Sequence, residues 1–195
     1  MNQLARTLMA IGLFFLFYSS AYAQELGVKI GLNASTINRP NWQRDEASLG
    51  VGWQIGGYII PFKTPNHVYA ELQIANQNFG YTNDTRMRTY FTQLFILGKI
   101  AIKDSPARFI GGFGASYFMG GDLRYPEKIG DTRRVESLER DDKLDYSIPA
   151  VLGLMLDFKK IKVDFRGEFD LYREGQIASR STFALSLYYT GRYIK

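Results

Sequence analysis

The stretch from Ile161 to Tyr172 constrains the fold more than any other part of the sequence, because apolar and charged side chains alternate along it. A period of two residues is that of a β-strand. From Lys162 to Glu168 the charges also change sign at successive charged positions, as if arranged to pair with one another. Two environments fit such a strand: a sheet face in water, or the polar lumen of a membrane barrel whose apolar face meets lipid. The apolar face carries Ile161, Val163, Phe165, Phe169 and Leu171, and the charged face carries Lys162, Asp164, Arg166, Glu168 and Asp170.

The N-terminus has the three parts of a secretory signal peptide. Arg6 is followed by an apolar run from Leu8 to Tyr18, and residues 21–23 form an A-x-A cleavage site. The alternative is an N-terminal membrane anchor, but the apolar run is shorter than the ~20 residues that a membrane-spanning helix needs. We therefore expect a signal peptide at residues 1–23 and a single exported domain at residues 24–195.

Composition narrows the choice of environment for that domain. The chain has 24 Lys and Arg against 19 Asp and Glu, mixed along the sequence, so binding to nucleic acid is not indicated. There is no cysteine, which excludes a disulfide framework and a lipoprotein-type acylated cysteine. Beyond the signal peptide no apolar run reaches the length of a transmembrane helix. A membrane protein with this sequence must be a closed barrel, because only helices and barrels satisfy their backbone groups in lipid.

The alternating pattern recurs along the chain and predicts eight strands. We expect them at residues 26–33, 49–60, 68–77, 89–102, 107–118, 145–158, 161–172 and 183–193. The connections are alternately long and short: residues 34–48, 78–88, 119–143 and 173–180 read as long loops, and residues 61–67, 104–106 and 159–160 as short turns. Short periplasmic turns and longer outer loops are typical of outer-membrane barrels. A soluble lipocalin-like barrel is the alternative, but it would place its large apolar residues inside.

The alternation also predicts which face of each strand points outward. In the first two strands the outer faces are Leu26, Val28, Ile30 and Leu32, and Leu49, Val51, Trp53, Ile55 and Ile59. The fourth strand is apolar on both faces around Gln93 and Lys99, so its facing stays open. Pro149 lacks a ladder donor within the sixth strand and predicts a bulge or local edge there.

Three segments resemble a known family. Residues 27–33, 91–99 and 163–166 look like the PorT-like outer-membrane β-barrel family of Bacteroidetes. The resemblance covers the whole domain in strand order and length. The chain departs from the family pattern at Gln93 and Phe95, where an acid and a proline are frequent. It ends two residues after Tyr193, which we interpret as the aromatic assembly signal of outer-membrane barrels. The resemblance implies the fold and an outer-membrane location in a Gram-negative bacterium more than an activity, and one role that it suggests is as an accessory of protein secretion.

The predicted inner faces collect ten charged side chains of both signs. Buried charges are tolerated when they are paired and hydrogen-bonded, and an eight-stranded barrel is just wide enough for its own side chains. We therefore interpret this lumen charge network as a plug rather than a conducting pore, although a narrow pore for small solutes is the alternative function. The network comprises Lys29, Glu71, Lys99, Arg108, Asp157, Lys162, Asp164, Arg166, Glu168 and Asp170.

Signals for catalysis are weak. The one histidine, His67, falls in a predicted periplasmic turn, away from any nucleophile that it would have to serve as a general base. Paired acids such as Asp141 and Asp142 lie in a predicted loop, and no metal spacing or phosphate-binding motif is present. We expect no enzyme activity, no cofactor and no metal. An outer-membrane lipid-modifying enzyme is a less favoured alternative.

Basic and aromatic residues in the predicted outer loops indicate a binding surface. Guanidinium groups pair with phosphates in a bidentate way, so they suit the phosphates of lipopolysaccharide. Solvated loop charges without a partner are the equal alternative. The expected role is structural or interactive at the cell envelope, with outer-membrane lipid, lipopolysaccharide or a secretion protein as partner; the oligomeric state is not indicated. The candidate binding residues are Trp42, Arg86, Arg88, Arg124, Arg133 and Arg134.

Overall fold

Nine β-strands form one sheet in the computed structural model, which describes residues 25–38, 48–61, 67–80, 86–129, 132–138, 146–158, 160–174 and 179–193. The predicted signal peptide lies outside these residues. Within them no helix is long and apolar enough to cross a membrane. The strands are β1 (Glu25–Asn38), β2 (Ser48–Ile60), β3 (His67–Gly80), β4 (Arg86–Ala101), β5 (Ala107–Ile129), β6 (Thr132–Leu138), β7 (Tyr146–Phe158), β8 (Ile161–Glu174) and β9 (Ser179–Tyr193).

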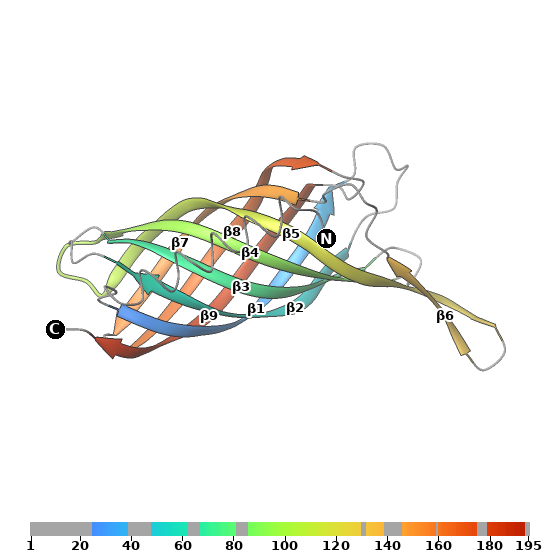
Figure 1. Ribbon diagram of the computed structural model, residues 1–195, viewed down its shortest axis with the longest axis horizontal. Coiled ribbons are helices and arrows are strands. Elements are labelled where there is room, and N and C mark those ends of the chain that lie inside the picture. Colours follow the sequence, from blue (N-terminus) through green and yellow to red (C-terminus); the bar gives the residue numbers. More distant parts are fainter. Residues whose placement is uncertain are drawn as a thin grey trace.

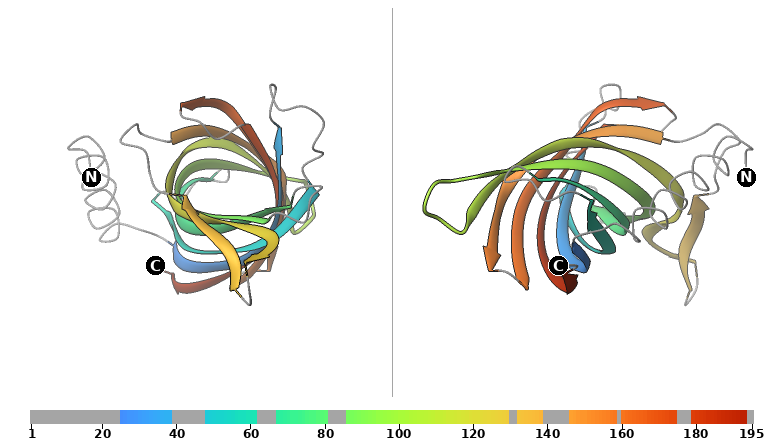
Figure 2. Two further views of the ribbon diagram at one scale, coloured as in Figure 1. Left: turned by 90° about the vertical axis from the view of Figure 1, so that its right-hand side faces the viewer. Right: turned by 60° about the vertical axis from the view of Figure 1, so that its left-hand side comes forward.

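Eight of these strands close into a barrel. Their order is β4-β3-β2-β1-β9-β8-β7-β5, and pairing of β4 with β5 completes the ring. Every pairing is antiparallel, and β1 pairs with β9, so the first and last strands meet. Figure 2 shows the closed ring nearly end on. The predicted eight-stranded antiparallel up-and-down β-barrel is confirmed, with β6 as an additional strand that pairs with β5.

Side chains alternate between the inside and the outside of the barrel wall. Charged and amide side chains are buried on the inside, while large apolar side chains cover the outside, as the period-two alternation predicts. On β8, Phe165 is 58% exposed and Leu171 is 71% exposed, whereas Asp164 and Arg166 are fully buried. A soluble barrel would show the reverse. Ile59 is the exception, because it is only 2% exposed although its position on β2 predicts an outward side chain.

Two local features left open by the pattern are settled. The fourth predicted strand, β4, turns Phe91, Gln93, Phe95 and Lys99 inward and Ile96 outward. Pro149 marks a register shift in the pairing of β7 with β8, in line with the predicted bulge. The missing backbone donor of proline explains why the ladder is interrupted at this residue.

The predicted loops are too long. β1 continues to Asn38, β3 to Gly80 and β8 to Glu174, so the ladders extend beyond the predicted ends of the strands. The largest error is the predicted structureless segment 119–143, which instead contains the end of β5 and the whole of β6. Polar residues occupy both faces of these extensions, so the alternation that marks a strand in lipid is lost there. Figure 1 shows β5 and β6 projecting together beyond the barrel.

The turn that joins β4 to β5 lies at the opposite end of the barrel from this projection. The turn between β4 and β5 passes through Asp104, which has a positive φ of 56°, a conformation that aspartate tolerates. The sequence 104–106 was predicted as a turn, and the chain indeed reverses there. The first residues of β1 and the last of β9 are paired at this same end.

Candidate functional site

A salt-bridged cluster crosses the centre of the lumen. Arg166 projects inward from β8 and Glu71 from β3, and these strands lie four places apart in the ring of eight, on opposite walls. The guanidinium donates to Glu71 through Nη2 to Oε1 at 2.7 Å and through Nη1 to Oε2 at 3.0 Å. Lys29 on β1 donates to the same carboxylate at 2.5 Å. All three side chains are fully buried. One carboxylate therefore ties three strands together across the barrel.

Further acids surround the guanidinium. Glu168 accepts from Arg166 Nε at 3.0 Å, and Asp164 Oδ2 lies 3.7 Å from Arg166 Nη1. The hydroxyl of Tyr188 lies 2.8 Å from Glu71 Oε2 and 2.7 Å from Asp164 Oδ2. A phenol carries one proton, so it donates to one of these two carboxylates at a time. Asp164 and Glu168 thus flank Arg166 on its own strand, and Tyr188 links the two walls.

Uncharged side chains fill the space around this cluster. Gln73 accepts from Lys29 at 2.7 Å and donates to Gln93 at 2.6 Å. The ring of Phe95 stacks on the guanidinium of Arg166, with 4.9 Å from Cζ to the ring centroid. Amides that both donate and accept can connect a network of charges without adding to its net charge. The centre of the lumen is therefore occupied by side chains of the barrel itself.

Two smaller ion-pair groups lie above and below the centre. At the turn end, Lys162 bonds to Glu25, and Lys99 Nζ lies 3.4 Å from Asp157 Oδ2. A cavity of about 10 Å³ lies between this group and the centre and is lined by Tyr58, Tyr69, Tyr188 and both lysines, among others. A single water needs ~10–15 Å³. This space therefore holds one water at most.

The third group lies toward the loop end. Arg180 on β9 lies 3.3 Å from Asp170 on β8, and its Nη1 donates to Gln77 on β3 at 3.1 Å. The guanidinium also stacks on Phe91 of β4, at 4.2 Å from the ring centroid. Arg180 thus repeats, one layer higher, the arrangement of Arg166 over Phe95. Charged groups span the lumen in three successive layers.

Two solved structures have the same architecture. Neisserial surface protein A, NspA, is 7% identical with a TM-score of 0.57, over 84% of this chain and 96% of that chain. Ail, the attachment invasion locus protein of Yersinia pestis, is 13% identical with a TM-score of 0.50, over 86% of this chain and 97% of that one. No protein-family model matches the chain, and no curated protein matches it in sequence. The fold is that of the small eight-stranded outer-membrane barrels.

The structure brings nine of the ten predicted lumen charges into these layers. Arg108 is the one that it does not: this half-buried side chain donates to the carbonyl oxygens of Ser105 and Ala107 at 3.0 and 3.2 Å, at the turn. Its position on the inward-facing side of β5 is outweighed by its place at the strand end, where backbone carbonyl groups of the turn are within reach. Sequence reasoning missed Glu25 and Arg180. Glu25 precedes the first predicted strand, and Arg180 falls in a predicted loop. If the alternation of each strand is extended by a few residues, both positions face inward, and this signal could have identified them.

The predicted loop-binding residues do not all lie in loops. Arg86 and Arg88 belong to β4 and Arg124 to β5, so the structure corrects their assignment to loops. Arg133 and Arg134 belong to β6, and their side chains are not described. Trp42 lies outside the described residues. Arg86, Arg88 and Arg124 thus have fixed positions on the wall of the barrel.

No metal centre is assembled in the described part of the chain. There, no group of three or more His, Asp or Glu side chains is placed to hold a metal ion. His67 opens β3 opposite Lys99, which corrects its assignment to a turn, but its side chain is not described.

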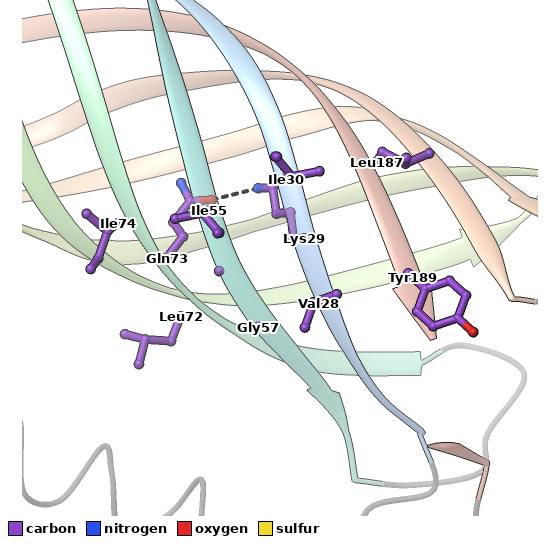
Figure 3. Close-up of a pocket in the computed structure, with 11 residues that line it drawn as sticks. Val28, Lys29, Ile30, Ile55, Gly57, Leu72, Gln73, Ile74, Leu187 and Tyr189 are labelled. Atoms are coloured by element: carbon purple, nitrogen blue, oxygen red, sulfur yellow. Dashed lines mark hydrogen bonds between the residues drawn. The ribbon is translucent and has the colours of Figure 1, made fainter. Parts of the chain in front are cut away.

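A groove of about 580 Å³ hollows the outer wall around Gly57. Its rim is formed by apolar side chains of four adjacent strands, including Val28, Ile55, Leu72 and Leu187, with Tyr189 at one end. In Figure 3 these side chains point outward, while Lys29 and Gln73 form their hydrogen bond on the other side of the wall. The groove arises where glycine leaves a gap in the apolar surface. It opens on the outer face, and Lys29 and Gln73 of the central lumen layer are also among the residues that line it.

Proposed function

We propose that this protein is a small outer-membrane β-barrel with a lumen closed by its own side chains, and that it acts at the cell envelope through its outer surface and its projecting strands. The observation that carries this proposal is the contact of Arg166 with Glu71 on the opposite wall. A side chain that reaches a partner across the ring leaves no continuous path past that level. The lumen charges then serve to fill and hold a narrow barrel.

Conductance tests the closed lumen. Purified protein reconstituted in planar bilayers should show no single-channel steps, and neither should Arg108→Gln, a variant with a change outside the lumen layers. Reproducible channels whose conductance changes in Arg166→Ala would instead establish a narrow pore for small solutes, and the proposal of a self-filled barrel would fall.

Membrane placement rests on the apolar outer face and on the signal peptide expected at residues 1–23. The folded protein should migrate faster than the heated protein on a detergent gel and should fractionate with the outer membrane. Recovery of the folded protein in the soluble periplasmic fraction would refute this placement, because no lipid would then cover the exposed apolar side chains.

The interaction role is assigned to the strands that project beyond the barrel. The resemblance to the PorT-like family suggests that the partner is an envelope protein of a secretion system. A variant with residues 125–143 replaced by a short Gly-Ser linker keeps the part of β5 that pairs with β4. This variant should still show heat-modifiable migration but should lose a protein that the full chain retains after cross-linking in native membranes. An identical set of cross-linked proteins for both chains would refute the role.

A further inference from the structure

Three arginines lie side by side on the outer face of the barrel, near its loop end. We call Arg86, Arg88 and Arg124 the rim arginines. Met87, between the first two, is 3% exposed and faces the lumen, so Arg86 and Arg88 occupy outward positions of β4. The register pairs Arg86 with Arg124 and Arg88 with Asp122. Paired residues share a face, so Arg124 and Asp122 are also directed outward.

The pairing of Arg86 with Arg124 is electrostatically unfavourable, because like charges directly opposite each other destabilise a sheet. The position on the other side of Arg86 is Gly80, and the one beyond Arg124 is Val135, so neither ladder neighbour supplies a carboxylate. Asp122 accepts from Arg124 Nε at 2.5 Å. Among the described residues, Arg86 and Arg88 form no ion pair. Of the side chains that the structure describes on this face, the three arginines and Asp122 therefore leave an excess of two positive charges.

The rim arginines stand where the apolar surface ends. Outward positions of β4 toward the turn end are apolar at Leu94, Ile96 and Ile100, and Tyr90 precedes the arginines. From Ile100 to Arg88 the strand advances roughly 30 Å along the barrel axis, at ~3.3 Å per residue and a tilt of ~40°. The apolar band of an outer-membrane barrel is ~25 Å tall. Arg88 and Arg86 therefore lie just beyond the band, at the level of lipid headgroups.

We propose that the rim arginines bind the phosphate groups of a phosphorylated lipid in the outer leaflet. This inference rests on the proposed membrane placement, with the turns on the periplasmic side. A guanidinium presents a planar fork that matches phosphate oxygens, and a phosphate between Arg86 and Arg124 converts their repulsion into a shared attraction. The lipid is favoured over free phosphate because its acyl chains lie on the apolar surface that begins next to Tyr90.

The test uses diphosphoryl lipid A as the probe and the full mature chain in detergent micelles, with binding measured by native mass spectrometry. Arg86→Gln and Arg124→Gln should each weaken binding about tenfold or more, because a hydrogen-bonded charge pair is lost. Arg108→Gln is the matched control: it makes the same change on the same strand as Arg124, but at the turn end. It should leave binding unchanged.

The ligand side of the test needs no variant. Lipid A stripped of both phosphates should bind the unaltered protein at least about tenfold more weakly. Equal binding of the two lipids, or equal losses in Arg124→Gln and Arg108→Gln, would overturn the proposal. Inorganic phosphate that binds as tightly as the lipid would overturn the choice of a lipid. Heat-modifiable migration of every variant, measured separately, tests the barrel itself, so its failure is distinguishable from loss of this site.

In the absence of lipid, the rim arginines should lower the free energy of unfolding rather than raise it. Arg86→Gln removes the like-charge pair, so in plain detergent its free energy of unfolding should equal or exceed that of the unaltered protein. Diphosphoryl lipid A should then stabilise the unaltered protein more than the variant, because a ligand that binds only the folded state raises its stability. Loss of stability in Arg86→Gln without lipid would show a structural role and would contradict the proposed one.

Discussion

Replacing Glu71 by alanine should destabilise the barrel more than removal of any other single carboxylate in its lumen. This carboxylate accepts from Arg166 twice and from Lys29, and it lies 2.8 Å from the hydroxyl of Tyr188. In Glu71→Ala, Lys29 loses its ion pair, and among the described residues no other carboxylate pairs with it. Arg166 keeps Glu168 at 3.0 Å. Asp164 also stays near Arg166, at 3.7 Å, whereas the fully buried Lys29 is left without an ion-pair partner among the described residues.

The magnitude follows from the burial of these groups. Removing one partner of a buried ion pair costs about 3–5 kcal/mol, because the remaining charge has lost the partner that compensated its desolvation. Asp157→Ala is the control, since Asp157 is partly exposed and its oxygen lies 3.4 Å from Lys99. A pair that water can reach contributes at most about 1 kcal/mol. Both variants remove a carboxylate from the same lumen, so the difference between them reports the deeper burial of Glu71 together with its larger number of cationic partners.

Equilibrium unfolding in urea, with the protein in lipid vesicles, measures both changes. Trp53 lies on the outer face and is 45% exposed in the barrel, so its fluorescence reports departure from lipid. The double variant Glu71→Ala/Arg166→Ala should lose less than the sum of the single losses, by about 0.5–3 kcal/mol, because the two residues are in contact. Equal losses in Glu71→Ala and Asp157→Ala, or strictly additive losses in the double variant, would refute the central role of this carboxylate.

Three further predictions use the same unfolding assay. Gly56→Ala should cost about 1–3 kcal/mol, because its Cβ would lie 2.3 Å from the carbonyl oxygen of Leu72; Gly57→Ala, whose nearest contact is 3.5 Å, should stay within about 0.5 kcal/mol. Phe165→Arg, near mid-membrane, should cost about 2–4 kcal/mol and Leu171→Arg, nearer the headgroups, about 0–1; equal costs would argue against lipid on this face. Arg180→Gln should cost about 3 kcal/mol through loss of its buried contact with Asp170, and Arg180→Lys should recover part of it.

The facing of the strands could be predicted because lipid and lumen impose opposite demands on alternate residues. Phe165 and Arg166 are adjacent in sequence, and a single register assigns one to lipid and the other to the lumen. Where both faces carry the same kind of residue this rule is silent, as in β4, whose facing needed the structure. Gln93 and Lys99 face inward there, but Phe91 and Phe95 face inward as well. These two rings pack on the guanidinium groups of Arg180 and Arg166.

The partners of the lumen charges could not be predicted in the same way. Arg166 meets Glu71 because β8 and β3 stand opposite each other in the closed ring and reach the same height. The position of each residue along the barrel axis depends on how far every intervening strand is shifted relative to its neighbour. A local sequence pattern does not indicate these shifts. Arg108 is a second example. The alternation correctly placed it on the inward-facing side of β5, but its position at the turn determined which groups its side chain contacts.

The extensions beyond the lipid band were missed for a different reason. Strand pairing needs only backbone donors and acceptors, so β5 continues past Met119 and pairs with β6, where side chains need not alternate. Sequence periodicity therefore detects a barrel wall with two different faces rather than the strand itself. Residues placed just past the limit of the band, such as Arg86 and Arg124, are free of both demands, and neither lipid nor lumen accounts for two arginines paired face to face. A phosphate between them, as proposed, would supply the opposite charge that neither ladder neighbour provides.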